Sequence, residues 1–116
     1  PNKWTIEQLF QHLVDTERIF AYRALRFARK DATDLPGFDE NTYADATANS
    51  GRSLRRIMAE HDAVRNATIE LYRGLNAEEL LRTGVANGSR ISVRALGWTV
   101  AGHVTHHLRV LHERYL

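Results

Sequence analysis

The sequence of 116 residues lacks cysteine, has only two prolines and contains no long apolar run. Without cysteine, disulfides and every thiolate-based metal or nucleophilic site are excluded, so a metal would need nitrogen or oxygen ligands. No apolar stretch approaches the roughly 20 residues that cross a bilayer, and no signal-peptide pattern opens the chain. We therefore expect a single soluble domain over residues 1–116, located in the cytoplasm and without a membrane partner.

An excess of charge of one sign is also missing, because 16 Lys and Arg residues balance 14 Asp and Glu residues and leave a net charge of +2. The 14 arginines are scattered, and Arg55 with Arg56 is the only doublet. No basic stripe with interleaved aromatic residues is present, which disfavours nucleic-acid binding. The motifs G-x-S-x-G, P-loop and G-x-G-x-x-G are absent, so serine hydrolysis, nucleoside triphosphate chemistry and dinucleotide redox chemistry lack their local signatures.

What the sequence does have is helical periodicity in the long stretches that Pro1 and Pro36 leave uninterrupted, and this predicts an all-α fold. Thr5 and Gln8 have the spacing of a capping box and predict a first helix over about 5–30. Its apolar face comprises Ile6, Leu9, Phe10, Leu13, Phe20, Ala24 and Phe27. A loop should follow over 31 to about 43, with Pro36 and Gly37 as its turn residues.

A second long helix is predicted over about 46–74, with Gly74 as its stop. One broad face carries its apolar positions and a histidine: Leu54, Ile57, Met58, His61, Val64, Thr68, Ile69, Leu71 and Tyr72. Asn76 followed by Glu79 then predicts one short helical piece that ends near Gly84.

Asn87-Gly88 is the strongest hairpin-turn signal in the chain, although its flanks allow only a small extended pair. Ser92 then caps a last helix that runs to the C-terminus. The inner face of this helix comprises Val93, Leu96, Val100, Val104, Val110 and Leu111. The expected architecture is therefore three long helices with one irregular connection on either side of the middle helix.

Two histidines on the last helix carry the clearest chemical signal. His103 and His107 are four residues apart, which places two imidazoles on one helix face at about the separation that a single metal ion needs. The helical wheel puts both beside Leu96 and Val100, facing the bundle interior. The alternative is that they are core histidines with hydrogen bonds to their neighbours.

His12 on the first helix is the third candidate ligand, because it lies about 120° around that helix from the apolar stripe, on a flank that should face a different neighbour. Three neutral imidazoles with an open position for water form a known catalytic metal arrangement. The rivals are His61, which we interpret as a hydrogen-bonded core histidine, and His106, the nearest candidate for a general base. His112 falls on the outer face and should be solvated.

Several charged residues have both a structural and a functional interpretation. Glu17 lies on the apolar face of the first helix, so we expect an ion pair with an arginine such as Arg94 or Arg109, or a place near the metal region. Arg23, on the same side as His12, could receive an anionic substrate or bridge two helices. Asp39 and Glu40 could reach the mouth of the metal site or could be solvated loop acids.

Four segments together resemble the DinB-like superfamily of metalloenzymes, which includes the YfiT-like proteins. They are KWTIEQLFQHLVDTERIFAYRALRFAR, LPGFDENTY, GVANGSRISVRALGW and AGHVTHHLRVLHERYL, and they span nearly the whole chain. The resemblance implies an up-down four-helix bundle. It also implies a divalent metal bound by a histidine of the second bundle helix and an H-x-x-x-H pair of the last helix. These positions fall on His12, His103 and His107, with His106 completing the H-x-x-H-H form of some members.

The resemblance further implies a metal-dependent hydrolase, or a transferase that uses a low-molecular-weight thiol, acting on a small molecule. Zinc or nickel would suit the three imidazoles best, and iron or copper would also be accepted. The alternative is a metal-binding, stress-linked association protein without turnover. A metal site with an open position favours the enzyme, whereas four protein ligands favour the alternative.

The chain departs from the family pattern at its beginning, because members have a helix before the K-W-[ST] segment that here starts at Lys3. Three amphipathic helices would leave an apolar groove, so either the sequence is a fragment or a partner chain fills the groove. We also predict a homodimer through the outer face of the last helix. Its contact stripe comprises Trp98, Gly102, Thr105 and Arg109.

Overall fold

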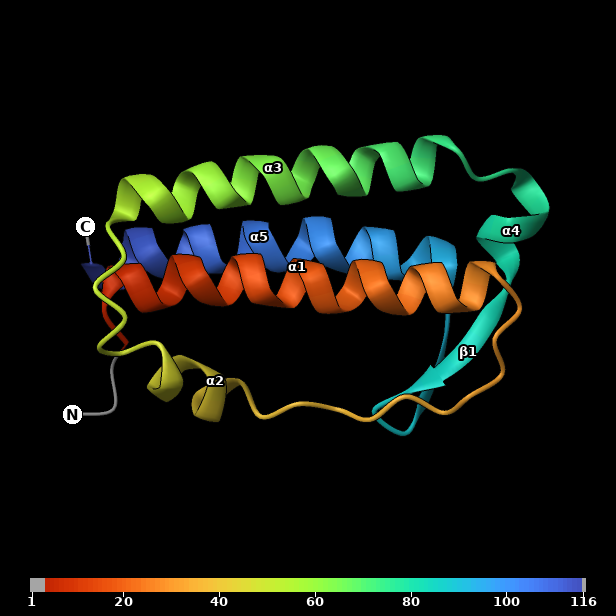
Figure 1. The fold of residues 1–116 in the computed structure, drawn as a ribbon, viewed down its shortest axis with the longest axis horizontal. Helices are drawn as coiled ribbons and strands as arrows, with labels where there is room; N and C mark the ends of the chain where they lie inside the picture. The colour runs from red at the N-terminus through yellow and green to blue at the C-terminus, as the bar shows by residue number, and fades with distance from the viewer. Residues whose placement is uncertain (1–3, 116) are drawn as a thin grey trace.

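The computed structural model describes the backbone of residues 4–115 and the side chains of residues 4–113. Three long helices lie side by side and form the body of the molecule (Figure 1): α1 (Ile6–Ala28), α3 (Leu54–Arg73) and α5 (Val93–Tyr115). The connections contain two short helices and one hairpin: α2 (Glu40–Ala46), α4 (Ala77–Leu81), β1 (Thr83–Ala86) and β2 (Ser89–Ser92). The predicted all-α bundle is therefore confirmed.

The ends of the helices follow from local capping chemistry. The Thr5 hydroxyl accepts the Gln8 N–H at 3.0 Å, and the Gln8 side chain accepts the Thr5 N–H at 2.8 Å, which confirms the predicted capping box. At the start of α5, the Ser92 hydroxyl accepts the Ala95 N–H at 3.0 Å. These side chains satisfy N–H groups that have no partner inside the helix.

The middle of the chain differs from the prediction, which extended the second long helix from about 46 to 74. A separate helix, α2, occupies 40–46, inside and beyond the expected loop, because the Asp39 carboxylate caps it by accepting two backbone N–H groups. Gly51 then adopts a left-handed φ of 72°, which ends helical continuity. Ser53 caps a new start, so α3 covers only Leu54–Arg73.

The hairpin forms where Asn87-Gly88 predicted it, with φ values of 52° and 77° at these two residues. Both lie in the left-handed region that a tight hairpin turn requires. Leu35 extends the hairpin by one bridge, because its N–H donates to the Val85 carbonyl at 2.9 Å and its carbonyl accepts the Asn87 N–H at 3.0 Å. The segment that follows α1 is thus held against the hairpin.

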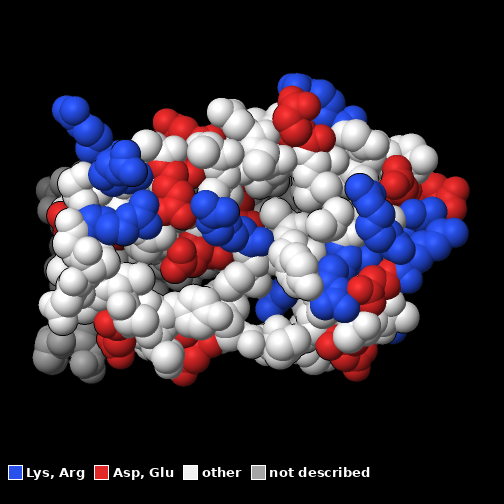
Figure 2. Space-filling view, in the orientation of Figure 1, with Lys and Arg blue, Asp and Glu red and all other residues white. Residues whose placement is uncertain are grey.

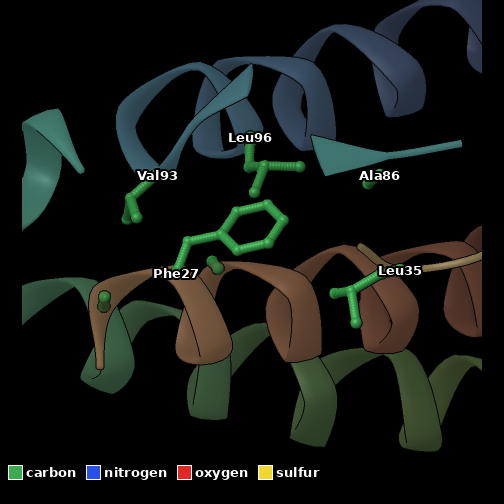
Figure 3. Close-up of a cluster of buried hydrophobic side chains, with 7 residues drawn as sticks. Phe27, Leu35, Ala86, Val93 and Leu96 are labelled. Carbon is green, nitrogen blue, oxygen red and sulfur yellow. The ribbon is translucent and has the colours of Figure 1, made fainter. Parts of the chain in front are cut away.

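One apolar cluster closes the end of the bundle where α1 ends and α5 begins. Phe27 points from α1 toward Val93 and Leu96 of α5, with Leu35 and Ala86 beside them (Figure 3). Gly84 is required here, since a Cβ at this position would lie 2.2 Å from the Phe27 ring. These contacts fix the first turns of α5 against α1 and thereby help to position the histidines further along α5.

α1 packs against both α3 and α5 and is the central helix of the three. On the face of α3 predicted to be apolar, only Ile57, Val64 and Thr68 are buried, and the Tyr72 hydroxyl at its end donates to the Val93 carbonyl of α5 at 2.7 Å. An apolar groove of about 380 Å³ lies between α3 and α5, and Trp98 beside it is 70% exposed. Within residues 4–115, no helix combines the length and the apolarity that a bilayer span requires.

Candidate metal centre

Three histidines from two helices meet at the side of the bundle. His12 lies on α1, and His103 and His107 lie one turn apart on α5. The Nε2 atom of His103 is 3.2 Å from Nε2 of His12 and 2.9 Å from Nε2 of His107. Each of the three residues offers a ring nitrogen within 4.8 Å of those of the others. The structure thus brings together the three residues selected from the sequence.

The surroundings hold the His12 ring in place. The Thr16 hydroxyl, one turn further along α1, lies 3.4 Å from His12 Nδ1. The Trp4 ring packs against the same imidazole with centroids 4.9 Å apart. Because a polar partner at Nδ1 leaves Nε2 to face the other two histidines, the arrangement orients a ligand atom toward the centre of the group.

The contacts among the three rings fit a bound cation better than they fit hydrogen bonds among histidines. A neutral imidazole carries one N–H and one lone pair, so His103 Nε2 can serve only one of its two close neighbours well. At His103 Nε2, therefore, either the contact with His12 or the contact with His107 is not a hydrogen bond. Nitrogens that bind one tetrahedral zinc at about 2.0–2.1 Å lie about 3.3 Å apart, close to the separations seen here.

Burial keeps the three rings neutral. Burial chiefly, together with charge repulsion within the histidine cluster, lowers the pKa of His12, His103 and His107 from the usual 6.5 to about 4. At pH 7 all three therefore present lone pairs without first losing a proton. Nδ1 of His107 is buried without a hydrogen-bond partner among the described residues.

An acidic residue stands at the edge of this group. Glu40, the first residue of α2, places Oε2 3.6 Å from His12 Nε2, and its side chain is largely exposed. Asp39 uses its carboxylate to cap α2. The expectation that an acid of this loop could reach the mouth of the site thus holds for Glu40, and the unforeseen helix α2 is what positions it.

A polar cavity of about 860 Å³ opens beside the histidines. Its wall combines α1, the segment before α2, the hairpin turn and one of the three histidines: Thr16, Phe20, Arg23, Gly37, Phe38, Asp39, Glu40, Asn87 and His103. The three-histidine group therefore has direct access to a space large enough for a small molecule.

Glu17 has the ion pair that its position on α1 required, but with a different partner. It is only 2% exposed, and the Arg65 guanidinium on α3 binds it as a fork, with Nη2–Oε1 at 2.8 Å and Nε–Oε2 at 3.0 Å. The expected partners Arg94 and Arg109 are wrong, because this side of α1 faces α3. Burial alone raises the pKa of Glu17, but hydrogen bonds, chiefly from Arg65, outweigh it and lower the pKa.

The other histidines lie outside the group. His61 is half-buried, and its Nδ1 lies 3.9 Å from Asp62 Oδ1, too far for the hydrogen bond that we expected of a core histidine. His106 is exposed, with its ring centroid 5.2 Å from that of His107, and it does not line the polar cavity. His112 is exposed, as predicted.

The fold and the site together define a helical bundle with a three-histidine group that could hold a metal ion. The family model described as the DinB superfamily matches residues 1–111, and the chain therefore belongs to this superfamily. No match was found among curated proteins or among solved structures.

Proposed function

We propose that the protein is a divalent-metal-dependent enzyme, a hydrolase or a thiol-dependent transferase, that acts on a small molecule. The observation that supports this best is a group of three neutral imidazoles beside a polar cavity, whose wall includes one of them, His103. Three protein nitrogens would leave a coordination position of the metal free, and a small molecule in the cavity beside His103 could reach it. A divalent cation held there would lower the pKa of a bound water or thiol toward neutrality.

The chain's own residues have distinct roles in this proposal. His12, His103 and His107 hold the cation, and Thr16 orients His12. Glu40 stands 3.6 Å from His12 Nε2 at the cavity wall, where its carboxylate can take up a proton from a water or thiol. His106 stays a weaker candidate for this role, because it is exposed and lies outside the cavity wall.

The choice of metal follows from the ligands. Three imidazoles without a thiolate suit zinc or nickel, and they also accept iron or copper. A thiol co-substrate would have to be a separate small molecule, because the chain has no cysteine. We propose that the enzyme acts in the cytoplasm, where such thiols stay reduced.

A second candidate function is a metal-binding association protein without turnover. Glu40 supports it, because a small rotation of this exposed side chain could supply a fourth protein ligand and close the site. Cobalt substitution separates the two functions, since the d–d spectrum of Glu40→Gln should match that of the wild type if water holds the fourth position. A large spectral change would favour the closed site.

Metal analysis of protein purified without a histidine tag tests the metal itself. We expect one equivalent of divalent metal per chain after dialysis against zinc, and none in His103→Ala, with the helical circular dichroism of both proteins equal. His112→Ala is the matched control, because it removes an exposed histidine from the same helix. Metal retention by His103→Ala would contradict the site, and loss of the fold would assign the metal a structural role.

A further inference from the structure

We propose that Arg23 is the carboxylate-binding residue of the polar cavity, so that the substrate of the proposed enzyme is a small carboxylic acid. This inference deepens the proposed function. Binding of a carboxylate by Arg23 can be tested by itself, and only the statement that the carboxylate is a substrate depends on the proposed function. Arg23 follows His12 by eleven residues, which is three helical turns or about 16 Å along the same face of α1. A ligand lying along α1 would thus meet the metal group at one end and Arg23 at the other.

The first argument is that Arg23 is buried without a counter-ion. It is 7% exposed, and within the described part of the chain its side chain donates one hydrogen bond, from Nη2 to the Pro36 carbonyl at 3.0 Å. A guanidinium has five N–H donors, so most of its capacity is unused. Among the described residues no carboxylate forms an ion pair with it, whereas the half-buried Arg26 and Arg65 are both paired. A buried charge without a partner is unfavourable unless a ligand completes it.

The second argument is that the unused donors are accessible. Arg23 lines the polar cavity, and it also lines a second cavity of about 480 Å³ whose wall includes Pro36 and Gly37. None of its nitrogen atoms is both fully buried and without a hydrogen-bond partner. Figure 2 shows a hollow near the middle of this face with Lys or Arg atoms inside it. A ligand can therefore reach the guanidinium from solvent.

The third argument identifies the anion. One guanidinium matches one planar carboxylate through two parallel hydrogen bonds. Asp39 and Glu40 line the same cavity, so a doubly charged phosphate would be repelled more strongly than a singly charged carboxylate. Phe20, whose ring centroid lies 5.4 Å from the Arg23 guanidinium carbon, and Phe38 offer apolar surface for the body of such an acid.

The experiment compares 3-phenylpropionate with its neutral isostere 3-phenylpropionamide on the metal-free protein at pH 7. We expect the acid to bind at least tenfold more tightly by calorimetry and to shift the Arg23 Nε–H signal in nitrogen-15 spectra. Arg23→Lys identifies that signal by its loss. Equal binding of acid and amide, an unmoved signal, or tighter binding of inorganic phosphate than of the acid would overturn the inference.

Variants locate the binding site and separate it from the metal. Arg23→Gln should weaken the acid at least tenfold, whereas Arg94→Gln, which removes an exposed charge bordering the apolar groove, should not. The acid is titrated into metal-free protein, so a failure of the metal proposal would leave this result intact. Binding that needs added zinc would place the carboxylate on the metal and refute the role of Arg23. If Arg23→Gln does not fold, the wild-type Nε–H titration decides.

Discussion

The two halves of α1 bury different kinds of side chain. Apart from Arg23, the second half buries only apolar residues, Ala24, Phe27 and Ala28, which belong to the apolar cluster of Leu35, Val93 and Leu96. The first half also has buried apolar residues, but between them it buries Gln11, His12, Thr16 and Glu17. We therefore expect substitutions in the second half to act mainly through lost apolar packing, and substitutions in the first half to act through buried polar groups that need specific partners.

The largest effect should come from the apolar half. Phe27→Ala removes a ring that is 1% exposed and leaves a cavity among Leu35, Val93 and Leu96. We expect the free energy of unfolding to fall by about 4 kcal/mol, as for other buried phenylalanines. Urea titration at low temperature measures this, with the partly exposed Leu25→Ala on the same helix as control. A loss below about 1 kcal/mol would contradict the assignment of the core.

Removing Arg65 from its ion pair with Glu17 should lower the free energy of unfolding more than removing the charge of Glu17 does. Arg65→Met leaves the Glu17 carboxylate buried and unpaired and should lower the free energy of unfolding by about 3 kcal/mol. Glu17→Gln leaves the Arg65 side chain, which is 34% exposed, able to reach water, so its effect should be smaller. Urea titration of both variants tests the order. The reverse order would mean that Arg65, not Glu17, is the group that burial penalises.

The free energy of unfolding of the metal-free protein should depend on pH through the three site histidines, of which His12 lies in the first half of α1. The three site histidines have a pKa of about 4 when folded and 6.5 when unfolded, so the unfolded chain binds more protons between these values. Their contribution to stability is complete above about pH 6.5 and is lost as the pH falls toward 4. Urea titrations from pH 7.5 to 4 should show this decline, and His103→Ala should flatten it while His112→Ala does not. An equal slope in all three proteins would refute it.

The smallest effect on folding should come from Trp98→Glu, because Trp98 is exposed in the single chain. The homodimer stays a prediction, and Trp98 with Gly102 is the contact that we propose for it. Light scattering at micromolar concentration should show a dimer for the wild type, a monomer for Trp98→Glu and a dimer for the control Thr99→Glu. A monomeric wild type, or a Trp98→Glu protein that still dimerises, would end the proposal.

The elements that the sequence predicts well are those decided by neighbouring residues. Thr5 with Gln8, Asn76 with Glu79, and Asn87-Gly88 each act within four positions, and each forms as expected. The start of α3 was misplaced because Gly51 and Ser53 lie in a stretch whose neighbours tolerate helix. The helix α2, whose start is capped by the Asp39 carboxylate, was not predicted from the sequence.

The same distinction holds for the site. The four-residue spacing of His103 and His107 predicts from the sequence that they share a helix face. The distance from His12 to His103 instead depends on how α1 packs on α5. The partner of Glu17 was missed because it depends on the rotation of α1 between two helices. Thr16 had a readable signal, since it follows His12 by four residues. Glu40 was expected only as a loop acid that could reach the site, because the sequence did not predict α2.

The approach of His12 to His103 has a consequence for the entropy of the chain. The two residues are 91 positions apart, so a cation that binds both closes a loop of nearly the whole sequence. For a covalent link, a loop of that length restricts the unfolded chain by about 4–5 kcal/mol. A metal that the unfolded chain does not bind would thus act as a reversible cross-link between its two ends. Chelation would then lower the melting temperature of this cysteine-free protein much as reduction lowers that of a disulfide-bonded one.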